Sequence, residues 1–595
     1  MASLSVKNVL LKAALVADEQ FGPWRERWRA AMETGNPEER TRFFAQEYGF
    51  GEEVFLQRLA QTLGWPYLDL KRLNFSAKSE GIKELCQKIT TKVAFQYTVM
   101  PTRLENNVLQ VVVSNPFDAD MLGAIHHAAR SQVEFALAPR ADIEDTLKRC
   151  YGVGAEVLDG MQQDDPDELL GPDNKEIAEG DQEASVIKFV NQVIWEAHKE
   201  RATDIHFEPM EDQLRIRYRI DGMLRETPLP TYLKRFQSAI ISRIKVMSGM
   251  NISEKRLPQD GRINVRIKKQ EIDIRVSTVP TVYGESVSLR LLTRGKVKLE
   301  LSTLGYSNDQ EAIIDQLIRK PHGIFLVTGP TGSGKSTSLY AFLHKINQPS
   351  KRIITVEEPV EYELAGVNQI AVRPEIGLTF AMGLRHILRQ DPNVVMVGEI
   401  RDLETAEIAI RAALTGHLVF STLHTNDAAS AFTRLIDMGI EPFLVASSVE
   451  AVMAQRLVRT ICNECKTEHH WDRDYLKRQG FPKEEVDAAK IYKGAGCPAC
   501  RELGYQGRIG IYELLVLSEP IRSLVLNRAP ASNIAQKAIE CGTRTLRMDG
   551  WRKVCAGITT IEEVLRVTQS EEHLAGLMEE NLKTQAKAAE ATHES

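Results

Sequence analysis

Hydrophobic residues recur along this chain with two spacings, and each spacing predicts one kind of element. Apolar positions three and four residues apart, the period of an amphipathic helix, predict helices over residues 55–63, 143–150, 184–200 and 236–247. Short apolar runs bounded by turn-forming residues predict strands over residues 108–114, 214–220, 263–267, 272–276 and 287–292. Helices and strands therefore mix throughout the chain, which indicates an α/β protein of several domains.

The most regular alternation of strands and helices lies within residues 308–460. Apolar strands are predicted at 323–328, 352–356, 394–397 and 418–422, with further elements between them. Such alternation builds a mostly parallel sheet, because each crossover connection returns the chain in the same direction. Ligands bind at the carboxyl ends of the strands in such sheets, so we expect a site there.

Length and charge patterning predict where the domains end. A chain of 595 residues is too long for one hydrophobic core. Residues 154–183 carry many acidic residues, interspersed proline and glycine and one lysine within 156–183, which predicts a flexible linker. The division that we expect is an N-terminal helical extension at 1–50, an α/β module at 51–153, the acidic linker at 154–183, a second α/β domain at 184–300, a nucleotide-binding core at 301–460, a tetracysteine insertion at 461–515, a C-terminal helical part at 516–570 and a polar tail at 571–595.

Residues 1–50 are polar and helical in character, with Trp24 and Trp28 one helical turn apart. This pattern favours a small helical subdomain in which both tryptophans pack inward. A face that docks a partner is the alternative, and the sequence leaves it open.

Composition excludes several classes of protein. A net charge of -6 gives no global reason to expect a nucleic-acid partner. No apolar stretch approaches the roughly 20 residues that span a bilayer, and residues 1–19 make a poor signal peptide. We therefore expect at most a peripheral membrane association.

A G-x-x-x-x-G-K-[ST] phosphate-binding loop follows the strand at 323–328 and precedes a helix-compatible run. It consists of Gly329, Pro330, Thr331, Gly332, Ser333, Gly334, Lys335, Ser336 and Thr337. The glycines let backbone N–H groups point at a triphosphate, and the following helix adds the positive end of its dipole. We expect Lys335 to reach the β- and γ-phosphates of ATP and the Ser336 hydroxyl to bind Mg²⁺.

Three more candidate residues follow the later strands of the same sheet. Glu357 follows the strand at 352–356, Glu399 follows 394–397, and His424 follows 418–422. Hydrolysis of ATP requires Mg²⁺, an oriented water molecule and stabilisation of negative charge. We expect Glu399 to hold the water shell of the metal, Glu357 to polarise the attacking water, and His424 to hydrogen-bond the γ-phosphate.

Four of the eight cysteines form two C-x-x-C pairs, Cys462 with Cys465 and Cys497 with Cys500. Four thiolates surround Zn²⁺ tetrahedrally and leave no position open, so the pairs predict a structural zinc site. Buried thiols without metal, or a redox pair, are the alternatives. His469 and His470 lie between the pairs as rival ligands.

These motifs together resemble the secretion ATPases of type II secretion and type IV pilus assembly, the GspE/PilB-like branch, over residues 55–570. The similar segments are the phosphate loop, ITVEEPVE at 354–361, RQDPNVVMVGEIRD at 389–402, TGHLVFSTLHTND at 415–427, and QRLVR at 455–459. Four earlier segments resemble the domain that precedes the family's ATPase core, namely TDIHFEP at 203–209, RIRYRIDG at 215–222, EKRLPQDGR at 254–262 and DIRVST at 273–278.

The resemblance implies a RecA-like ATPase core preceded by a PAS-like domain, with a zinc-ribbon insertion and a partner-binding N-terminal module. It further implies a homohexamer that binds ATP between two domains, with Arg219, Arg275 and Arg290 as candidates for the arginines that complete the site. The implied partners are an inner-membrane platform protein and a membrane adaptor on the cytoplasmic side, which implies a cytoplasmic protein attached to the inner face of the membrane.

Two positions depart from the family's pattern. Glu358 and Asn393 stand where the family usually has aspartate. The first change lengthens an acidic side chain beside the site and the second removes a charge near its edge, so we keep the activity. The N-terminal module lacks the Arg-Leu-Gly repeats with which some relatives bind cyclic di-GMP, and we do not expect that ligand.

The sequence therefore favours a motor ATPase of pilus assembly or type II secretion. A nucleic-acid translocase on the same core is the alternative, disfavoured because no stretch interleaves aromatic and basic residues. An adaptor that binds ATP without turnover is a third possibility, disfavoured by the intact Lys335, Glu357 and Glu399. The motifs do not decide between the pilus and the secretion machine.

Overall fold

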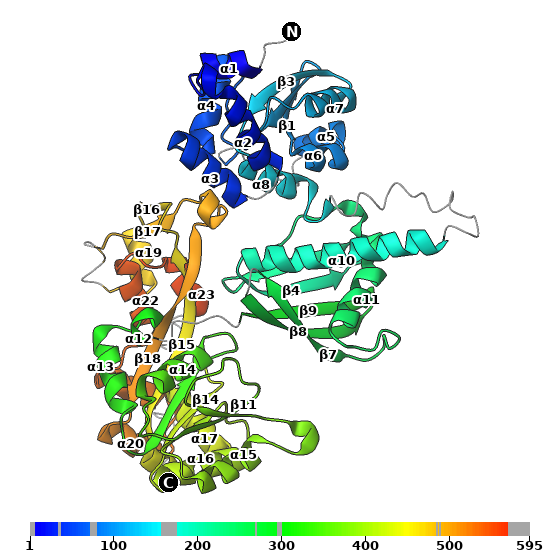
Figure 1. Cartoon of the computed structure of the whole chain (residues 1–595). Helices are drawn as coiled ribbons and strands as arrows, with labels where there is room; N and C mark the ends of the chain where they lie inside the picture. Colours follow the sequence, from blue (N-terminus) through cyan, green and yellow to red (C-terminus); the bar gives the residue numbers. More distant parts are fainter. Residues whose placement is uncertain are drawn as a thin grey trace, which may run out of the picture. The chain divides into compact units, whose positions relative to one another are not determined.

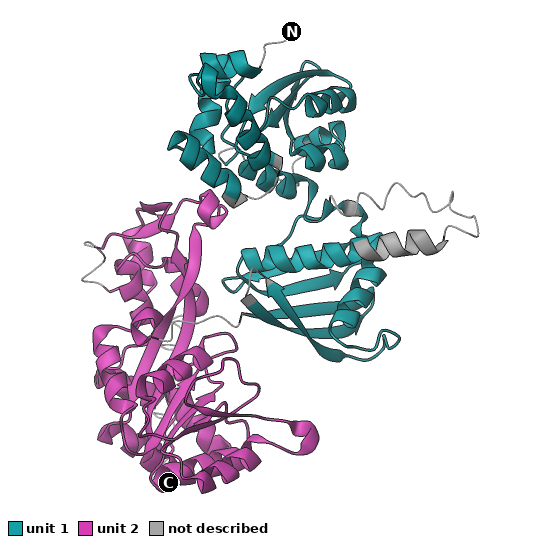
Figure 2. Cartoon of the chain, viewed as in Figure 1, with its two compact units in different colours: residues 1–294 teal, residues 295–595 magenta. Residues whose placement is uncertain are grey.

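The computed structural model divides the chain into two compact units, residues 1–294 and 295–595 (Figure 2). It describes residues 6–33, 37–71, 80–155, 175–267, 270–293, 300–482, 486 and 489–568. Each unit is considered by itself.

The first part of the first unit, residues 6–155, folds around one hydrophobic core that extends from Val9 to Leu147. A three-stranded sheet in the order β1-β2-β3 lies in it, with β1 antiparallel and β3 parallel to β2 (Figure 1). Its elements are α1 (Val6–Lys12), η1 (Asp18–Gln20), α2 (Phe21–Glu33), α3 (Pro37–Tyr48), α4 (Glu52–Leu63), α5 (Glu80–Lys88), α6 (Thr91–Tyr97), β1 (Met100–Glu105), β2 (Val108–Val113), α7 (Ala119–Ala129), β3 (Gln132–Leu137) and α8 (Arg140–Tyr151).

Both early tryptophans lie in this core. Trp24 and Trp28 expose 3% and 8% of their surface, and the ring of Trp28 lies 5.4 Å from that of Phe55. The expectation that they pack inward is confirmed. Because Phe55 belongs to α4, the helices of residues 6–48 share one core with the α/β module that follows them.

The second part of the first unit is a six-stranded antiparallel sheet in the order β6-β5-β4-β9-β8-β7. Helices α10 and α11 pack on each other and bury Phe189, Val193 and Ile244 against it. Its elements are α10 (Lys175–Lys199), β4 (Ala202–Pro209), β5 (Leu214–Ile220), β6 (Met223–Glu226), η2 (Thr231–Phe236), α11 (Gln237–Met247), β7 (Gln259–Ile267), β8 (Gln270–Thr281) and β9 (Gly284–Thr293).

The start of α10 falls within the segment that the sequence predicts as a linker. Helix α10 begins at Lys175, while residues 156–174 lie outside the described part of the chain.

The second unit is built on a seven-stranded sheet in the order β12-β11-β13-β14-β10-β15-β18, parallel except for the final antiparallel pair. Its elements up to β15 are α12 (Leu301–Leu304), α13 (Asn308–Leu317), β10 (Gly323–Thr328), α14 (Lys335–Ile346), β11 (Ile353–Glu357), β12 (Asn368–Ala371), η3 (Pro374–Ile376), α15 (Phe380–Ile387), η4 (Leu388–Gln390), β13 (Val394–Val397), α16 (Leu403–Leu414), β14 (Leu418–Leu423), α17 (Ala429–Asp437), α18 (Pro442–Ser448) and β15 (Val449–Ile461).

The central strands of this sheet are covered on both faces. Every residue of β10, β13 and β14 is buried, as is typical of parallel strands between two helical layers. Successive residues of β10 point into different cores: Leu326 joins the cluster that includes α16 and α17, and Phe325 joins the cluster that includes α14. The alternation fixes the register of the strand, and so the position of the loop that follows Thr328.

Of the remaining elements, β18 completes the sheet and α22 packs against β18 and β15. They are β16 (Lys466–Glu468), α19 (Arg473–Arg478), β17 (Tyr492–Gly494), η5 (Pro498–Cys500), β18 (Tyr505–Val516), α20 (Glu519–Leu526), α21 (Ala531–Glu540), α22 (Leu546–Cys555) and α23 (Ile561–Val567). Leu476 and Phe481 of the cysteine-containing insertion pack with Trp551 and Val564, so the insertion shares a core with α22 and α23. Among the described residues, no helix is both long enough and apolar enough to cross a membrane.

Candidate functional site

The phosphate loop connects β10 to α14 at the carboxyl edge of the seven-stranded sheet. The ammonium of Lys335 donates to the carbonyl oxygens of Gly329 at 2.8 Å and Pro330 at 3.2 Å, which folds the side chain back over the loop. The buried Ser333 hydroxyl has no hydrogen-bond partner among the described residues. A lysine bonded to neutral oxygens, an unsatisfied hydroxyl and the start of a helix fit an anionic ligand.

The first glycine of the loop is required by its contact with β15. Gly329 has φ of 149°, and a Cβ built on it would lie 2.6 Å from the backbone oxygen of Gln455. Any side chain at this position would push the loop away from the neighbouring strand. Gln455 also accepts a hydrogen bond from Ser338 of α14 at 2.8 Å, so it ties β15 to the helix that follows the loop.

A chain of charges connects the ends of three strands near the loop. Arg401 donates to Glu399 at 2.6 Å and lies 3.1 Å from the carboxylate of Glu358, and Nε2 of His424 lies 3.3 Å from Glu399. The hydrogen bond that Arg401 donates to Glu399 is the main reason why the pKa of Arg401 is raised. The structure thus brings Glu399 and His424 together, as their places after β13 and β14 predict.

Glu357 lies in a different environment from Glu399. It is buried with 4% of its surface exposed, and its carboxylate accepts hydrogen bonds from Thr355 at 2.5 Å, from Gln369 at 3.0 Å and from the Tyr340 hydroxyl. Tyr340 belongs to α14, and its oxygen also accepts from the backbone N–H of Glu361 at 3.1 Å. Neutral donors therefore hold Glu357 between the helix of the phosphate loop and the loop after β11.

Threonine hydroxyls join the histidine-bearing loop to its neighbours. Thr328, at the end of β10, lies 2.7 Å from the hydroxyl of Thr425 and accepts from its backbone N–H at 2.9 Å. Thr422 donates to the carbonyl of Gly398 at 2.7 Å, next to Glu399. Part-buried hydrogen bonds therefore connect the end of β10, the loop after His424 and the residue before Glu399.

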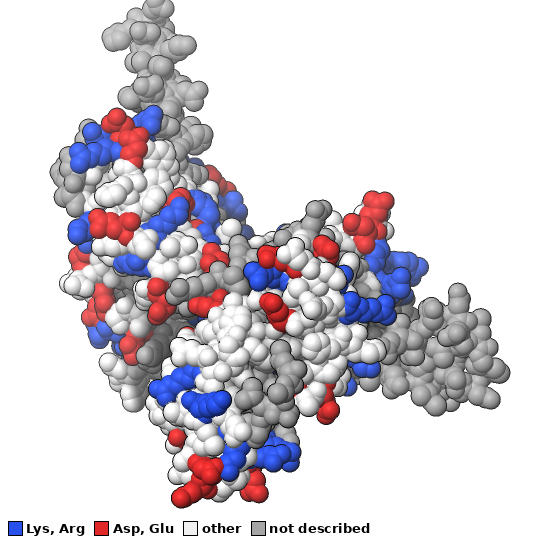
Figure 3. All heavy atoms as spheres, turned by 90° about the horizontal axis from the view of Figure 1, so that it is seen from above, with Lys and Arg blue, Asp and Glu red and all other residues white. Residues whose placement is uncertain are grey.

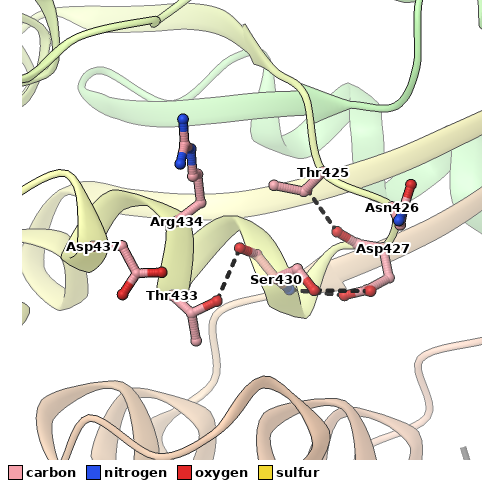
Figure 4. Close-up of a pocket in the computed structure, with 7 residues that line it drawn as sticks. All are labelled: Thr425, Asn426, Asp427, Ser430, Thr433, Arg434 and Asp437. Atoms are coloured by element: carbon pink, nitrogen blue, oxygen red, sulfur yellow. Dashed lines mark hydrogen bonds between the residues drawn. The ribbon is translucent and has the colours of Figure 1, made fainter.

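A polar pocket of about 410 Å³ opens beside the same loop (Figure 4). Thr425, Asn426 and Asp427 line it from the loop, and residues of α17 complete its wall. Asp427 accepts from the backbone N–H and the hydroxyl of Ser430, at 2.7 and 2.8 Å, and so caps the start of α17 (Figure 4). The pocket thus lies beside the loop that directly follows His424 in the chain.

The electrostatics of Lys335 reflect this setting. Burial lowers the pKa of Lys335 to about 8, the charge of Glu399 opposes this shift, and the charge of Arg456 adds to it. The lysine is still mostly protonated at pH 7, as binding of phosphate requires. Its pKa is expected to rise when an anion binds, because the ligand supplies the negative charge that the loop lacks.

The three arginines expected to complete the site lie in the first unit, in one row across its sheet. Asp204 of β4 is the register partner of both Arg219 and Arg290, and Arg290 is the partner of Arg275. Asp204 binds Arg290 at 2.9 Å and lies 3.6 Å from Arg219. Arg275 and Arg290 line a cavity of about 600 Å³, together with Arg262 of β7. The structure therefore groups these arginines with a fourth that was not singled out from the sequence.

The four cysteines converge as their spacing predicts. The Sγ atoms of Cys462, Cys465, Cys497 and Cys500 all lie within 4.8 Å of one another, with separations of 3.7 to 3.8 Å for three pairs. A Zn–S bond of about 2.3 Å in a tetrahedron places the sulfurs about 3.8 Å apart. Backbone N–H groups of Cys497 and Gly504 donate to the sulfur of Cys500, each at 3.2 Å. Among the described residues the cluster contains these cysteines and neither intervening histidine.

Several residues around the site were not assigned a role from the sequence. Arg401 follows Glu399 by two positions, while Tyr340 and Gln369 reach Glu357 from α14 and β12. Arg401 and Arg262 lie within the segments 389–402 and 254–262 that resemble the family. Their positive charge within these segments could have identified them as candidate site residues. Tyr340 and Gln369 carried no such signal, because only the order of strands and helices brings them to Glu357.

The fold and the site together define a P-loop ATPase: a phosphate loop at the carboxyl edge of a mostly parallel sheet, with Glu399 and His424 beside it.

Comparison with known proteins specifies the family. The family described as "Type II/IV secretion system protein" matches residues 179–566, and the "MshEN domain" matches residues 65–157. The type II secretion system ATPase E of Vibrio cholerae is 46% identical over 438 residues, which cover 72% of this chain and 86% of that protein. The type II secretion system protein E of Xanthomonas campestris is 41% identical over 543 residues, covering 89% and 95%. The type IV pilus assembly ATPase PilB of Thermus thermophilus is 43% identical over 525 residues, covering 87% of this chain and 57% of that protein.

The chain belongs to the family of type II secretion ATPase E and type IV pilus assembly ATPase PilB. It is an ATPase of the class that powers type II secretion or type IV pilus assembly.

Proposed function

We propose that this protein is a hexameric motor that hydrolyses Mg-ATP at the phosphate loop and drives an inner-membrane platform protein of a pilus or secretion machine. The observation that carries the proposal is the grouping of Glu399, His424 and Arg401 beside the loop that holds Lys335. The family membership of residues 179–566 supports the coupling to secretion or pilus assembly.

In this proposal the seven-stranded sheet is a RecA-like core, the six-stranded sheet with α10 and α11 is a PAS-like domain, and the cysteine cluster organises a zinc ribbon. The proposal keeps the other expected segments with three changes: the helices of residues 6–48 share a core with the N-terminal module, residues 175–183 belong to α10, and β18 belongs to the seven-stranded sheet. The protein works in the cytoplasm, attached peripherally to the membrane through its platform protein and a cytoplasmic-side adaptor.

Each residue near the loop has a role that follows from its surroundings. Lys335 and Ser336 would hold the triphosphate and Mg²⁺, and the metal supplies charge neutralisation on the phosphate oxygens when it is bound. Glu399 orients water beside the metal site, and Arg401, which is paired with it, holds the carboxylate in position. His424 reports on the γ-phosphate through its contact with Glu399. Glu357 polarises the attacking water.

The buried position of Glu357 sets a condition on that last role. Its contacts to Tyr340, Thr355 and Gln369 fix the carboxylate in one place, so water must approach it there or the side chain must turn toward the phosphate. The arginine row of the first unit supplies positive charge for the transferring phosphate, with Arg275 and Arg290 in the cavity and Arg219 at its side.

The test is release of inorganic phosphate by the purified oligomer with Mg-ATP, alone and with its membrane platform protein. We expect hydrolysis that the platform protein stimulates and DNA does not. Glu399→Gln is expected to bind ATP and to hydrolyse it at least ~10²-fold more slowly, because the carboxylate acts in the transition state. Absence of phosphate release by the wild-type protein in the presence of its partner contradicts the proposal, and stimulation by DNA alone favours a translocase.

A further inference from the structure

Arg456 lies on β15, directly beside the phosphate loop. Thr328, the last residue of β10, pairs in register with Ala454, so Arg456 stands just beyond the point where the loop begins. A Cβ built on Gly329 would lie 3.1 Å from Nη1 of Arg456. The guanidinium thus contacts the first turn of the loop, on the side where Lys335 folds back to Gly329.

Among the described residues, the hydrogen-bond partners of the guanidinium are all neutral groups. Nη1 donates to the carbonyl of Gln455 at 3.0 Å, and Nη2 donates to the carbonyl of Asn426 at 2.8 Å. In the part of the chain that the structure describes, no carboxylate lies within 4.0 Å of Arg456. The acidic groups that face it from a greater distance are Asp427, which caps α17, and Glu513 of β18.

A partly buried cation without an ionic partner is unfavourable, because protein atoms replace part of its hydration shell. Burial accordingly lowers the pKa of Arg456. Lys335 is in the same condition at the same turn of the loop, with carbonyl oxygens as its hydrogen-bond acceptors. A ligand with several negative charges explains why two such cations lie beside one phosphate loop.

We propose that Arg456 is a further binding residue for the terminal phosphates of the nucleotide, acting from the same unit as the phosphate loop. A guanidinium suits this role because its several N–H donors reach phosphate oxygens while two remain on the backbone. Its bond to Asn426, two residues after His424, also transmits the presence of phosphate to the histidine-bearing loop. The inference rests on the proposed nucleotide site and adds to it a cation that the phosphate-loop motif does not include.

The test compares the affinity of the full-length protein for a fluorescent, slowly hydrolysed ATP analogue with Mg²⁺. The variants are Arg456→Gln, Arg456→Lys, Lys335→Ala and the control Arg411→Gln, whose side chain is 76% exposed on α16. We expect Arg456→Gln to raise Kd at least ~10-fold, the value of one charge-assisted hydrogen bond. Arg456→Lys keeps the charge and is expected to raise Kd by less than ~3-fold. Arg411→Gln binds like the wild type.

Salt dependence separates the effect of charge from that of the hydrogen bond to Asn426. The slope of log Kd against log salt is expected to be shallower in Arg456→Gln than in the wild type, and unchanged in Arg411→Gln. Circular dichroism melting of each variant establishes that it is folded. Wild-type affinity in Arg456→Gln, equal losses in the lysine and glutamine variants, or an unchanged salt slope overturns the inference. Failure of the wild type to bind the analogue would instead overturn the proposed nucleotide site.

Discussion

At the scale of single residues, burial and partners divide acidic groups of the same type into different roles. Glu399 and Glu358 both contact the exposed Arg401, whereas Glu357 is buried among neutral donors. Glu513 of β18 shows a third situation: it is buried and accepts hydrogen bonds from the backbone N–H groups of Ala428 and Leu546, at 2.8 and 3.4 Å. It connects the start of α17 with the start of α22.

The pH dependence of stability follows from Glu513. Burial, assisted by the charge of Asp427, raises the pKa of Glu513 from 4.5 to about 7. Between these values the folded chain binds the proton more tightly than the unfolded chain, so the free energy of unfolding falls as pH rises from about 4.5 to 7. The loss from this group is about 3 kcal/mol at most, and it is complete above pH 7.

Glu513→Gln removes this titration. We expect its melting temperature, relative to the wild type, to rise as pH increases from 5 to 8, on top of a constant loss from the missing acceptor. The control is Glu519→Gln, whose side chain is 86% exposed on α20 and whose removal leaves the wild-type slope. If the melting temperatures of Glu513→Gln and the wild type change with pH in the same way between pH 5 and 8, Glu513 does not have the raised pKa.

At the scale of elements, strand ends and short hairpins place the functional groups. The ends of β10, β13 and β14 carry the phosphate loop, Glu399 and His424, because parallel pairing aligns these ends. The cysteine cluster lies beyond the carboxyl end of β15 and before the start of β18, where β16 and β17 form a short antiparallel ribbon. A ribbon of three residues per strand is too small to be stable alone, so we expect the fold of the insertion to depend on a metal held by the cysteines and on the helices that pack against it.

Zinc removal tests this dependence. Elemental analysis is expected to find about one zinc per chain, and Cys497→Ser is expected to lose the metal and lower the melting temperature. Cys541→Ser is the matched control, because Cys541 is exposed and lies outside the cluster. A protein that contains no zinc and melts like the wild type would disprove a structural metal.

At the scale of the whole molecule, the groups that we propose for hydrolysis belong to two different units. The phosphate loop lies in residues 295–595, and the arginine row lies in residues 1–294. Acidic and basic side chains of the described residues are interspersed on the face shown in Figure 3.

Arg275 tests whether the first unit takes part in hydrolysis. Arg275→Gln is expected to lower kcat at least ~10²-fold without changing the melting temperature, because arginines that stabilise transferred phosphate act in the transition state. The control is Arg266→Gln on the same sheet, whose side chain is 71% exposed and pairs with Glu271. The mass of the wild type and of both variants is measured by light scattering. A mass of about six chains for each protein would show that a lower kcat is not caused by a loss of assembly. Unchanged turnover in the Arg275 variant would remove it from the site.

The sequence alone determined the features that depend on local spacing. The glycines of the phosphate loop, the buried strands before it and the two cysteine pairs each need only neighbouring residues to be recognised, since backbone freedom, apolar periodicity and ligand spacing are local properties. The positions of Glu399 and His424 followed from one rule, that parallel strand ends share an edge.

Only the tertiary structure decided which side chains meet across the sheets. The pairing of Arg401 with Glu399, the enclosure of Glu357 by Tyr340 and Gln369, and the contact of Arg456 with the phosphate loop depend on strand order and register. Such contacts join residues far apart in the chain, and their energies depend on burial that no local pattern records. The helical start of α10 was likewise decided by context, because the same acidic residues suit both a solvated linker and the N-terminal end of a helix.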